Sequence, residues 1–199
     1  MLFLIVNMIK GIIFDMVGPL LQKNPVYVFD EVIETAEKIK NNFPNDKEFI
    51  KALGENEVTK RYSLEEIAQK VVSKYCKISE IWNILLPKLK ENYKLGIINN
   101  GTAITIPYFK KENNFDEFFS IFINSSEVNI EKPDSRIYLL ALEQMNLKPE
   151  ECVFIDDMMD NVLGAEKIGM KGLLFTNYTK LITDLISFNI DIKFDILKP

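Results

Sequence analysis

The sequence of 199 residues contains no histidine, and this absence excludes every catalytic or metal site that is built on an imidazole ring. Serine and cysteine nucleophiles that need a histidine base are excluded, as are zinc sites with histidine ligands. Any catalysis must therefore use side chains such as Asp, Glu, Lys, Asn, Ser, Thr, Tyr or Cys. Among metal ions, carboxylate and carbonyl oxygens suit a hard cation such as Mg²⁺.

Cysteine is scarce, and positive charge is not in excess. The two cysteines, Cys76 and Cys152, lie far apart in the sequence, and Cys152 begins an apolar run. We therefore expect reduced thiols and a cytoplasmic protein rather than a disulfide. The net charge of -5 and the pI near 5.0 provide no basic field for nucleic acid or for an anionic membrane surface. We expect neither as a partner.

Long hydrophobic runs are also missing. The first seven residues are apolar, but they are too short for a secretory signal with its cleavage site and far too short to span a bilayer. We expect them to form a loosely ordered lead-in to the first strand, and Met8 is an equally good start for such a chain. A hydrophobic content of 47% supports one substantial core and one small accessory domain.

Short apolar runs alternate with amphipathic segments, which predicts an α/β fold with a Rossmann-like parallel sheet and crossover helices. The predicted strands are Gly11 to Phe14, Leu95 to Ile98, Ser120 to Ile123, Cys152 to Ile155 and Gly172 to Phe175. Helices are expected from Ser135 to Gln144 and from Met158 to Ile168, the second of which Gly169 closes.

No strand-like run is recognised between the first two of these strands. Four amphipathic segments fill this interval instead, and they predict helices at Val26 to Lys40, Asp46 to Leu53, Ser63 to Tyr75 and Ile78 to Lys90. Ser63 is a typical helix start, and Pro87 is expected to divide the last segment. We therefore predict an all-helical cap at residues 23–90, inserted into a core formed by residues 1–22 and 91–199.

Polar residues follow three of the predicted strands at the point where each ends. Asp15 follows the first strand, Asn99-Asn100-Gly101 the second, and Asp156-Asp157 the fourth. Because the carboxyl ends of parallel strands open into the same crevice, these residues are expected to converge there. Lys132, between the third strand and the next helix, adds the only obvious cation. One lysine beside three aspartates predicts an anion that is held next to a metal ion.

Each of these positions also has a purely structural interpretation. Asp15 alone resembles a turn residue, and Asp156-Asp157 would favourably begin a helix. Asn99-Asn100-Gly101 is a good turn sequence, and Lys132 taken singly is typical of a solvated loop. Only their combined order favours a functional site. The aromatic residues Tyr62, Tyr75, Trp82 and Phe109 are interpreted as packing residues.

The order of these residues resembles the four sequence motifs of the haloacid dehalogenase-like hydrolase superfamily, and the resemblance covers nearly the whole chain. It is closest to the branch (subfamily IA) with a small helical cap after the first strand, which includes phosphatases and the phosphatase domain of soluble epoxide hydrolase. A receiver-type signalling domain is the nearest alternative fold. Its carboxylate pair follows the first strand rather than a late one, however, and it has no long helical insertion.

The resemblance implies a role for each residue of the first three motifs. Asp15 takes the place of the nucleophile that becomes an aspartyl ester, and Lys132 that of the lysine that steadies the nucleophile and the transferring group. Asn99 stands where a Ser or Thr hydroxyl usually holds the phosphate, and its amide can still donate a hydrogen bond. Asn100 is assigned to phosphate binding beside it.

The resemblance also implies a Mg²⁺ site. Asp157 falls at the usual metal ligand, together with Asp15 and the backbone carbonyl of Val17. Asp156 and Asn161 are implied as partners that act through the other ligands or through water.

The first motif departs from the family pattern at two positions. Val17 replaces the carboxyl group that protonates the leaving alkoxide and then activates water, and Pro19 removes a backbone N–H from the same loop. Family dehalogenases also lack this acid, but they typically lack the Asp-Asp pair that this chain retains.

Our leading hypothesis is a Mg²⁺-dependent phosphohydrolase that acts on a small phosphorylated metabolite and is weak or restricted to good leaving groups. A catalytically degenerate member that binds a phosphorylated ligand or a protein partner is the alternative, and a 2-haloacid dehalogenase is a third hypothesis. We expect a monomer or a homodimer.

Overall fold

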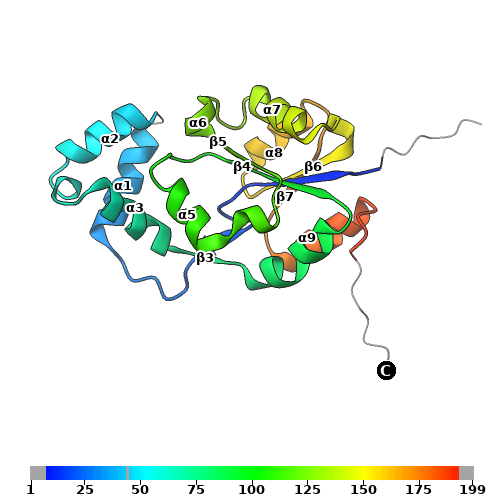
Figure 1. Cartoon of the computed structure of the whole chain (residues 1–199), viewed down its shortest axis with the longest axis horizontal. Helices are drawn as coiled ribbons and strands as arrows, with labels where there is room; N and C mark the ends of the chain where they lie inside the picture. The colour runs from blue at the N-terminus through cyan, green and yellow to red at the C-terminus, as the bar shows by residue number, and fades with distance from the viewer. Residues whose placement is uncertain (1–7, 44, 193–199) are drawn as a thin grey trace, which may run out of the picture.

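The computed structural model describes residues 8–43 and 45–192, so the predicted lead-in at residues 1–7 lies outside the described part of the chain. Its centre is a parallel sheet of five strands in the order β5-β4-β1-β6-β7 (Figure 1). The strands are β1 (Gly11–Phe14), β4 (Lys94–Asn99), β5 (Ile121–Asn124), β6 (Cys152–Asp156) and β7 (Lys171–Leu174). All five predicted strands are therefore confirmed, with ends shifted by only one residue.

The strand order places β1 between β4 and β6, and both pairings are parallel. From β1 the sheet therefore grows in one direction through β4 and β5 and in the other through β6 and β7. Such a reversal leaves a crevice at the carboxyl ends of the central strands, where α/β proteins bind their ligands. Asp15, directly after β1, lies at this point.

Side chains alternate between the two faces of the sheet, and helices cover both faces. In β1, Ile12 and Phe14 belong to one hydrophobic cluster and Ile13 to the other. The cluster that contains Ile13 also includes side chains of α7 (Ser135–Met145) and α8 (Met159–Glu166). The opposite cluster includes side chains of α9 (Tyr178–Ser187). Strands buried on both faces read as continuous apolar runs, which is why they were recognisable in the sequence.

Three helices form a separate lobe at the left of Figure 1. They are α1 (Glu31–Asn42), α2 (Asp46–Glu55) and α3 (Leu64–Ser73), and their side chains Val32, Ala36, Phe49, Leu53 and Ile67 form a small hydrophobic cluster of their own. The predicted start of α3 is confirmed by a capping box: Ser63 Oγ accepts from the Glu66 N–H at 3.2 Å, and the Glu66 carboxylate accepts from the Ser63 N–H at 2.7 Å.

The expectation that the insertion contains only helices was wrong. β2 (Leu21–Lys23) pairs antiparallel with β3 (Tyr75–Lys77), so a two-stranded ribbon joins the lobe to the core. Each strand has three residues, which is too short for a recognisable alternation, and each finds its partner far away in the sequence. The predicted helix from Ser63 to Tyr75 accordingly ends at Ser73, and that from Val26 to Lys40 begins only at Glu31, after its cap Asp30.

The last predicted segment of the insertion packs against the sheet. A π-helical turn (Ile81–Leu85) is followed by α4 (Leu86–Lys90), so the division falls one residue before Pro87. Ile81, Leu85 and Leu89 share the hydrophobic cluster of Ile12 and Phe14. The domain boundaries at residues 22 and 90 stay a prediction, and this packing favours a cap that ends near β3.

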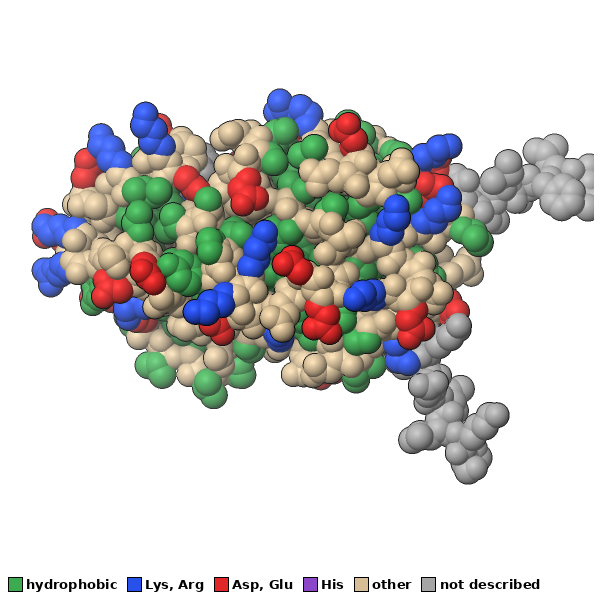
Figure 2. Space-filling model, in the orientation of Figure 1, with side chains coloured by type: hydrophobic (Ala, Val, Ile, Leu, Met, Phe, Trp, Pro, Cys, Tyr) green, Lys and Arg blue, Asp and Glu red, His purple; other side chains and the backbone are tan. Residues whose placement is uncertain are grey.

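The surface seen in Figure 2 carries acidic and basic side chains interspersed, without a broad region of one sign. Within residues 8–43 and 45–192, no helix has the length and apolar character that crossing a membrane requires. Cys76 and Cys152 are both free thiols, as predicted, and Cys152 is buried.

Candidate active site

The end of β1 carries Asp15 into the crevice. Its N–H donates to the Ile155 carbonyl at 2.7 Å, which continues the pairing with β6 by one residue. The residue is 8% exposed. After it, the chain turns through Gly18, whose φ of +109° is a conformation that favours glycine. The pairing with β6 thus fixes the position of Asp15 at the end of the strand.

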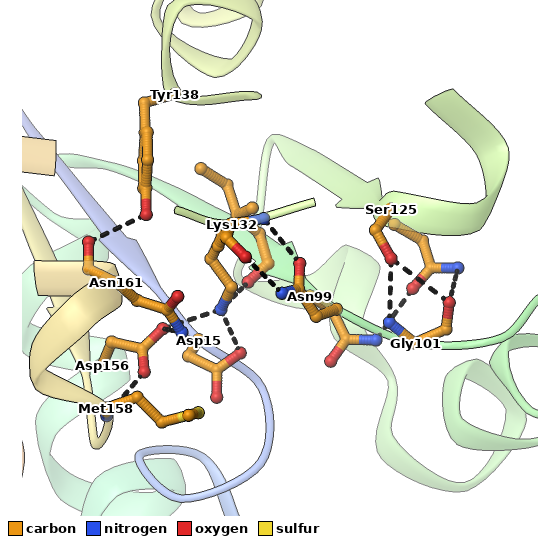
Figure 3. Close-up of polar contacts among 12 residues, drawn as sticks. Asp15, Asn99, Gly101, Ser125, Lys132, Tyr138, Asp156, Met158 and Asn161 are labelled. Atoms are coloured by element: carbon orange, nitrogen blue, oxygen red, sulfur yellow. Dashed lines mark hydrogen bonds and ion pairs between the residues drawn. The ribbon is translucent and has the colours of Figure 1, made fainter. Parts of the chain in front are cut away.

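Lys132 is the centre of the polar network in Figure 3. Its Nζ donates to Asp15 Oδ1 at 2.6 Å, to Asp156 Oδ2 at 2.7 Å and to the Ile98 carbonyl at 3.0 Å. An ammonium group has three donors, and all three are used. The lysine is 4% exposed, so these charge-assisted bonds act where water screens them little. The predicted meeting of Asp15, Lys132 and Asp156 is therefore observed.

Asn100 holds the backbone of Lys132 in place. Its Nδ2 donates to the Lys132 carbonyl at 2.9 Å, and its Oδ1 accepts from the Lys132 N–H at 2.9 Å. Both polar atoms of the side chain are therefore engaged with the lysine. A contact of Asn100 with phosphate stays a prediction.

Asp156 is fully buried and held from several sides. Its Oδ2 accepts from Asn161 Nδ2 at 3.0 Å in addition to Lys132, and its Oδ1 accepts from the Met158 N–H at 2.8 Å. Asn161 is itself held by Tyr138, whose hydroxyl donates to the Asn161 carbonyl at 2.8 Å. These contacts make Asp156 an anchor for Lys132, and the indirect role of Asp156 and Asn161 in a metal site stays a prediction.

Three carboxylates converge around this lysine. Asp15, Asp156 and the exposed Asp157 each offer one oxygen, and these oxygens lie within 4.8 Å of one another. Burial raises the pKa of Asp15 to about 6, against the opposing effect of Lys132. Partial burial, followed by the charge of Asp156, also raises the pKa of Asp157. Three acidic groups beside one lysine leave a surplus of negative charge at this edge.

This donor set fits a hard divalent cation, because it offers carboxylate oxygens in a region of surplus negative charge. Asp156 is occupied by Lys132, Asn161 and Met158, so Asp15 and Asp157 are the more available ligands. Gly18 makes room for Asp157: a Cβ at Gly18 would lie 2.6 Å from the Asp157 carboxyl carbon. The assignment of the Val17 carbonyl as a further ligand stays a prediction.

Asn99 has a defined orientation at the end of β4. Asn124 Nδ2 donates to the Gly101 carbonyl at 3.2 Å, so its Oδ1 faces the other way and accepts from Asn99 Nδ2 at 2.8 Å. In Figure 3 the nitrogen of the Asn99 amide points toward this pair, and its oxygen lies on the opposite side. Phosphate binding by Asn99 stays a prediction, and one of its two N–H groups is already used.

Ser125 fastens the same loop, because the Gly101 N–H donates to Ser125 Oγ at 3.2 Å. Neither Asn124 nor Ser125 was identified from the sequence. Both follow the rule that identified the others, since Asn124 is the last residue of β5, at the same edge of the sheet.

Val17 lines a cavity of about 170 Å³ between the crevice and the cap lobe. Its side chain packs against the hydrophobic cluster of the core. Asn99, Asn100 and Gly101 line the same cavity. An apolar group thus stands where the family pattern places a proton donor.

A family model for haloacid dehalogenase-like hydrolases matches residues 9–169. The chain belongs to this family. As a haloacid dehalogenase-like hydrolase it is 37% identical over 93 residues to the glyceraldehyde 3-phosphate phosphatase of Methanothermobacter thermautotrophicus, a match that covers 45% of this chain and 40% of that protein. The phosphatase of the same name from Pyrococcus furiosus is 26% identical over 151 residues, 74% of this chain and 63% of that protein. This hydrolase therefore spans less than two thirds of the length of either relative.

Solved structures share the fold of this haloacid dehalogenase-like hydrolase. A family enzyme of Bacteroides thetaiotaomicron, in complex with magnesium and inorganic phosphate, superimposes with a TM-score of 0.68 at 21% identity, covering 87% of this chain and 98% of that one. A predicted family hydrolase of Porphyromonas gingivalis gives a TM-score of 0.67 at 21% identity, over 90% of this chain and 98% of the other.

Proposed function

We propose that this protein is a Mg²⁺-dependent phosphohydrolase that acts on a small phosphorylated metabolite through an aspartyl-phosphate intermediate on Asp15. The observation that carries the proposal is the buried ion-pair cluster, in which Lys132 joins Asp15 to Asp156 beside the carboxylate of Asp157. Relatives named as glyceraldehyde 3-phosphate phosphatase and as pyrophosphatase support the reaction class. The magnesium and phosphate in a structural neighbour support the cofactor.

We assign a part of the reaction to each group. Lys132 holds one oxygen of Asp15, so the other oxygen is oriented for attack on phosphorus. The ammonium group also neutralises charge as the phosphoryl group transfers, which is where most of this catalysis arises. Mg²⁺, held by Asp15 and Asp157, would supply further neutralisation of charge on the phosphate.

Val17 restricts the substrates that can react well. General acid catalysis is typically worth about 10²- to 10⁴-fold in rate, and a valine cannot supply it. Esters whose leaving group departs without a proton avoid most of this loss. We therefore propose aryl, acyl or anhydride phosphates as the preferred substrates and expect alkyl phosphates to react slowly.

The test is phosphate release from an aryl and an alkyl phosphate, each with and without Mg²⁺. We expect turnover of the aryl ester that requires Mg²⁺ and is lost in Asp15→Asn, with much slower turnover of the alkyl ester. Equal rates for both esters would show that another group replaces the missing acid. The absence of turnover with aryl, acyl and anhydride phosphates would contradict the proposal.

A second candidate function is ligand binding without catalysis, and the residues Val17, Pro19 and Asn99 favour it. It predicts saturable binding of inorganic phosphate by calorimetry in a protein that turns over none of these esters. A 2-haloacid dehalogenase, a third candidate, would release halide from short 2-haloacids. The convergent Asp15, Asp156 and Asp157 carboxylates favour phosphate chemistry over that reaction.

A further inference from the structure

We propose that the cavity beside Val17 is a leaving-group chamber that selects phosphate esters of a single, compact aromatic ring. The inference rests on the proposed phosphohydrolase function and narrows its substrate class. The cavity has a volume of about 170 Å³ and adjoins the loops that follow β1 and β4. Met16 and Val17 after β1 and Asn99 and Asn100 at the end of β4 line this space, so it is the cavity that the leaving group of a phosphate ester at Asp15 would occupy.

The chamber has walls from both lobes, and most of its lining is apolar. The core contributes Val17, Ile104 and Phe109, while the cap contributes Ala36, Phe49 and Val71. Glu37, Lys40, Asn99, Thr102 and Thr105 add polar groups to the lining, whereas the apolar side chains offer contact area to an apolar occupant. The organic part of the substrate should therefore be apolar where it meets these walls.

The size of the chamber matches one ring. Apolar cavities of about 150 Å³ in proteins bind benzene, so about 170 Å³ accommodates a phenyl group but not a fused bicyclic one. The ring of Tyr75 stands 6.0 Å from that of Phe109 in a tilted arrangement. Aromatic walls at such distances favour a third ring through edge and face contacts.

Among the polar side chains of the cap wall, Glu37 and Tyr75 are hydrogen-bonded, and Lys40 Nζ lies 5.9 Å from the centroid of the Phe49 ring. Glu37 Oε1 accepts from the Tyr75 hydroxyl at 3.1 Å, and Glu37 Oε2 accepts from Lys74 Nζ at 2.5 Å. Lys74 also bonds to Glu34 Oε1 at 3.1 Å. Since these partners satisfy Glu37 and Tyr75, the substrate does not have to supply polar groups to them.

Val17 affects both the binding of the leaving group and its departure. An aspartate at this position would protonate an alkoxide, whereas the valine adds apolar surface between Asp15 and the chamber. A phenolate departs without a proton far more readily than an alkoxide does. The same side chain thus favours an aryl group by its contact and by its lack of an acid.

The experiment compares the binding of phenylphosphonate and methylphosphonate to the Mg²⁺-loaded wild-type protein by calorimetry, with competition by inorganic phosphate. Neither compound is turned over, and they differ only in the ring. Burial of the ring predicts at least about tenfold tighter binding of phenylphosphonate, and 1-naphthylphosphonate should bind no better than methylphosphonate. Equal affinities for phenyl- and methylphosphonate would overturn the inference.

A matched pair of variants at Ile104 tests the location of the ring. Ile104 is half-buried, and it lines the chamber. Ile104→Phe should remove the preference for phenylphosphonate over methylphosphonate, while Ile104→Ala should admit 1-naphthylphosphonate. Unchanged ligand preferences in both folded variants would place the ring elsewhere and overturn the inference.

The two proposals fail in distinguishable ways. Tight binding of phenylphosphonate by a protein without any turnover would contradict the phosphohydrolase and leave the chamber standing. Turnover of aryl and acetyl phosphates without any preference for phenylphosphonate would do the reverse. The wild-type ligand series decides the inference even where a variant does not fold.

Discussion

Lys132 is the single side chain on which the geometry of the crevice depends most. It separates Asp15 from Asp156, and all three groups are buried. Removing one partner of such a pair leaves uncompensated buried charge, which is more costly than the loss of an exposed ion pair. Both catalysis and stability therefore depend on Lys132.

We predict that Lys132→Met abolishes phosphate release and lowers the free energy of unfolding by about 3–5 kcal/mol, as urea denaturation would measure. Lys70→Met is the matched control, because Lys70 pairs with Asp30 at the partly exposed surface of the cap. We expect it to change stability by about 1 kcal/mol or less. Similar losses in both variants would contradict the role given to the buried cluster.

At position 17 we predict a gain of function. Val17→Asp restores a carboxyl group where the family pattern has one, and alkyl phosphate turnover should rise by about 10²-fold or more. Val17→Asn is the control, because it has nearly the same shape but cannot transfer a proton. If the asparagine variant gains as much as the aspartate variant, polarity rather than acid catalysis is the cause.

The sequence predicts the charged residues of the site better than the amide residues. Asp15, Lys132 and Asp156 meet as expected. The two aspartates stand at the ends of buried strands that are visible in the sequence, and Lys132 lies in the loop between β5 and α7. Phosphate binding by Asn100 stays a prediction, and the bonds of its side chain to the Lys132 backbone were not foreseen. The position of an amide after a strand does not show which neighbour it faces, since nearly any polar group can pair with it.

At the scale of elements, the cap lobe depends on how its helices begin. α3 starts with the reciprocal bonds between Ser63 and Glu66, and its side chain Ile67 belongs to the small cluster that joins α1, α2 and α3. A small cluster leaves little stability in reserve. Loss of the N-terminal capping bonds of α3 should therefore lower the free energy of unfolding measurably.

We predict that Ser63→Ala lowers the free energy of unfolding by about 1 kcal/mol, as thermal or urea denaturation would measure. Ser73→Ala is the control in the same helix, because the Ser73 hydroxyl is exposed and only bonds back to the Lys70 carbonyl. We expect this substitution to change stability by less than about 0.5 kcal/mol. An effect of Ser73→Ala as large as that of Ser63→Ala would argue against the capping box as the cause.

Elements with strong local patterns were predictable, and those defined by distant partners were not. The strands of the central sheet are apolar runs bounded by turns, which a sequence displays directly. β2 and β3 have three residues each. Without their mutual pairing, β2 would be taken for a loop and β3 for the end of the preceding helix. Val26 and Val28 resemble the start of a helix, but both are exposed, and the cap at Asp30 places the start later.

At the scale of the whole molecule, the two thiols differ in their exposure. Cys76 can therefore react in the folded protein, whereas Cys152 can react only after unfolding. Cys152 opens β6 and is fully buried, while Cys76 in β3 is partly exposed. Burial raises the pKa of Cys152 to about 12, so its reactive thiolate is absent from the folded protein at neutral and mildly alkaline pH. Its reaction must await unfolding of the sheet.

We predict that iodoacetamide labels Cys76 in the native protein and labels Cys152 only at the rate of global unfolding, as mass spectrometry of the peptides would show. Raising the pH through the mildly alkaline range should not permit labelling of Cys152 in the folded protein, because its folded pKa stays well above that range. A Cys76→Ser variant isolates the slow signal. Equal labelling rates of both thiols in native buffer would contradict the buried position of β6.

The most direct test of the account is a search for phosphate on Asp15. Without an acid-base group at position 17, hydrolysis of the intermediate should be slower than its formation, so the phosphoenzyme should accumulate. We predict that acid quenching during turnover of an aryl phosphate with Mg²⁺ yields the Asp15 peptide carrying a phosphoryl group. Asp15→Asn should yield none. Turnover without any phosphorylated Asp15 peptide, or turnover that persists in Asp15→Asn, would contradict Asp15 as the nucleophile.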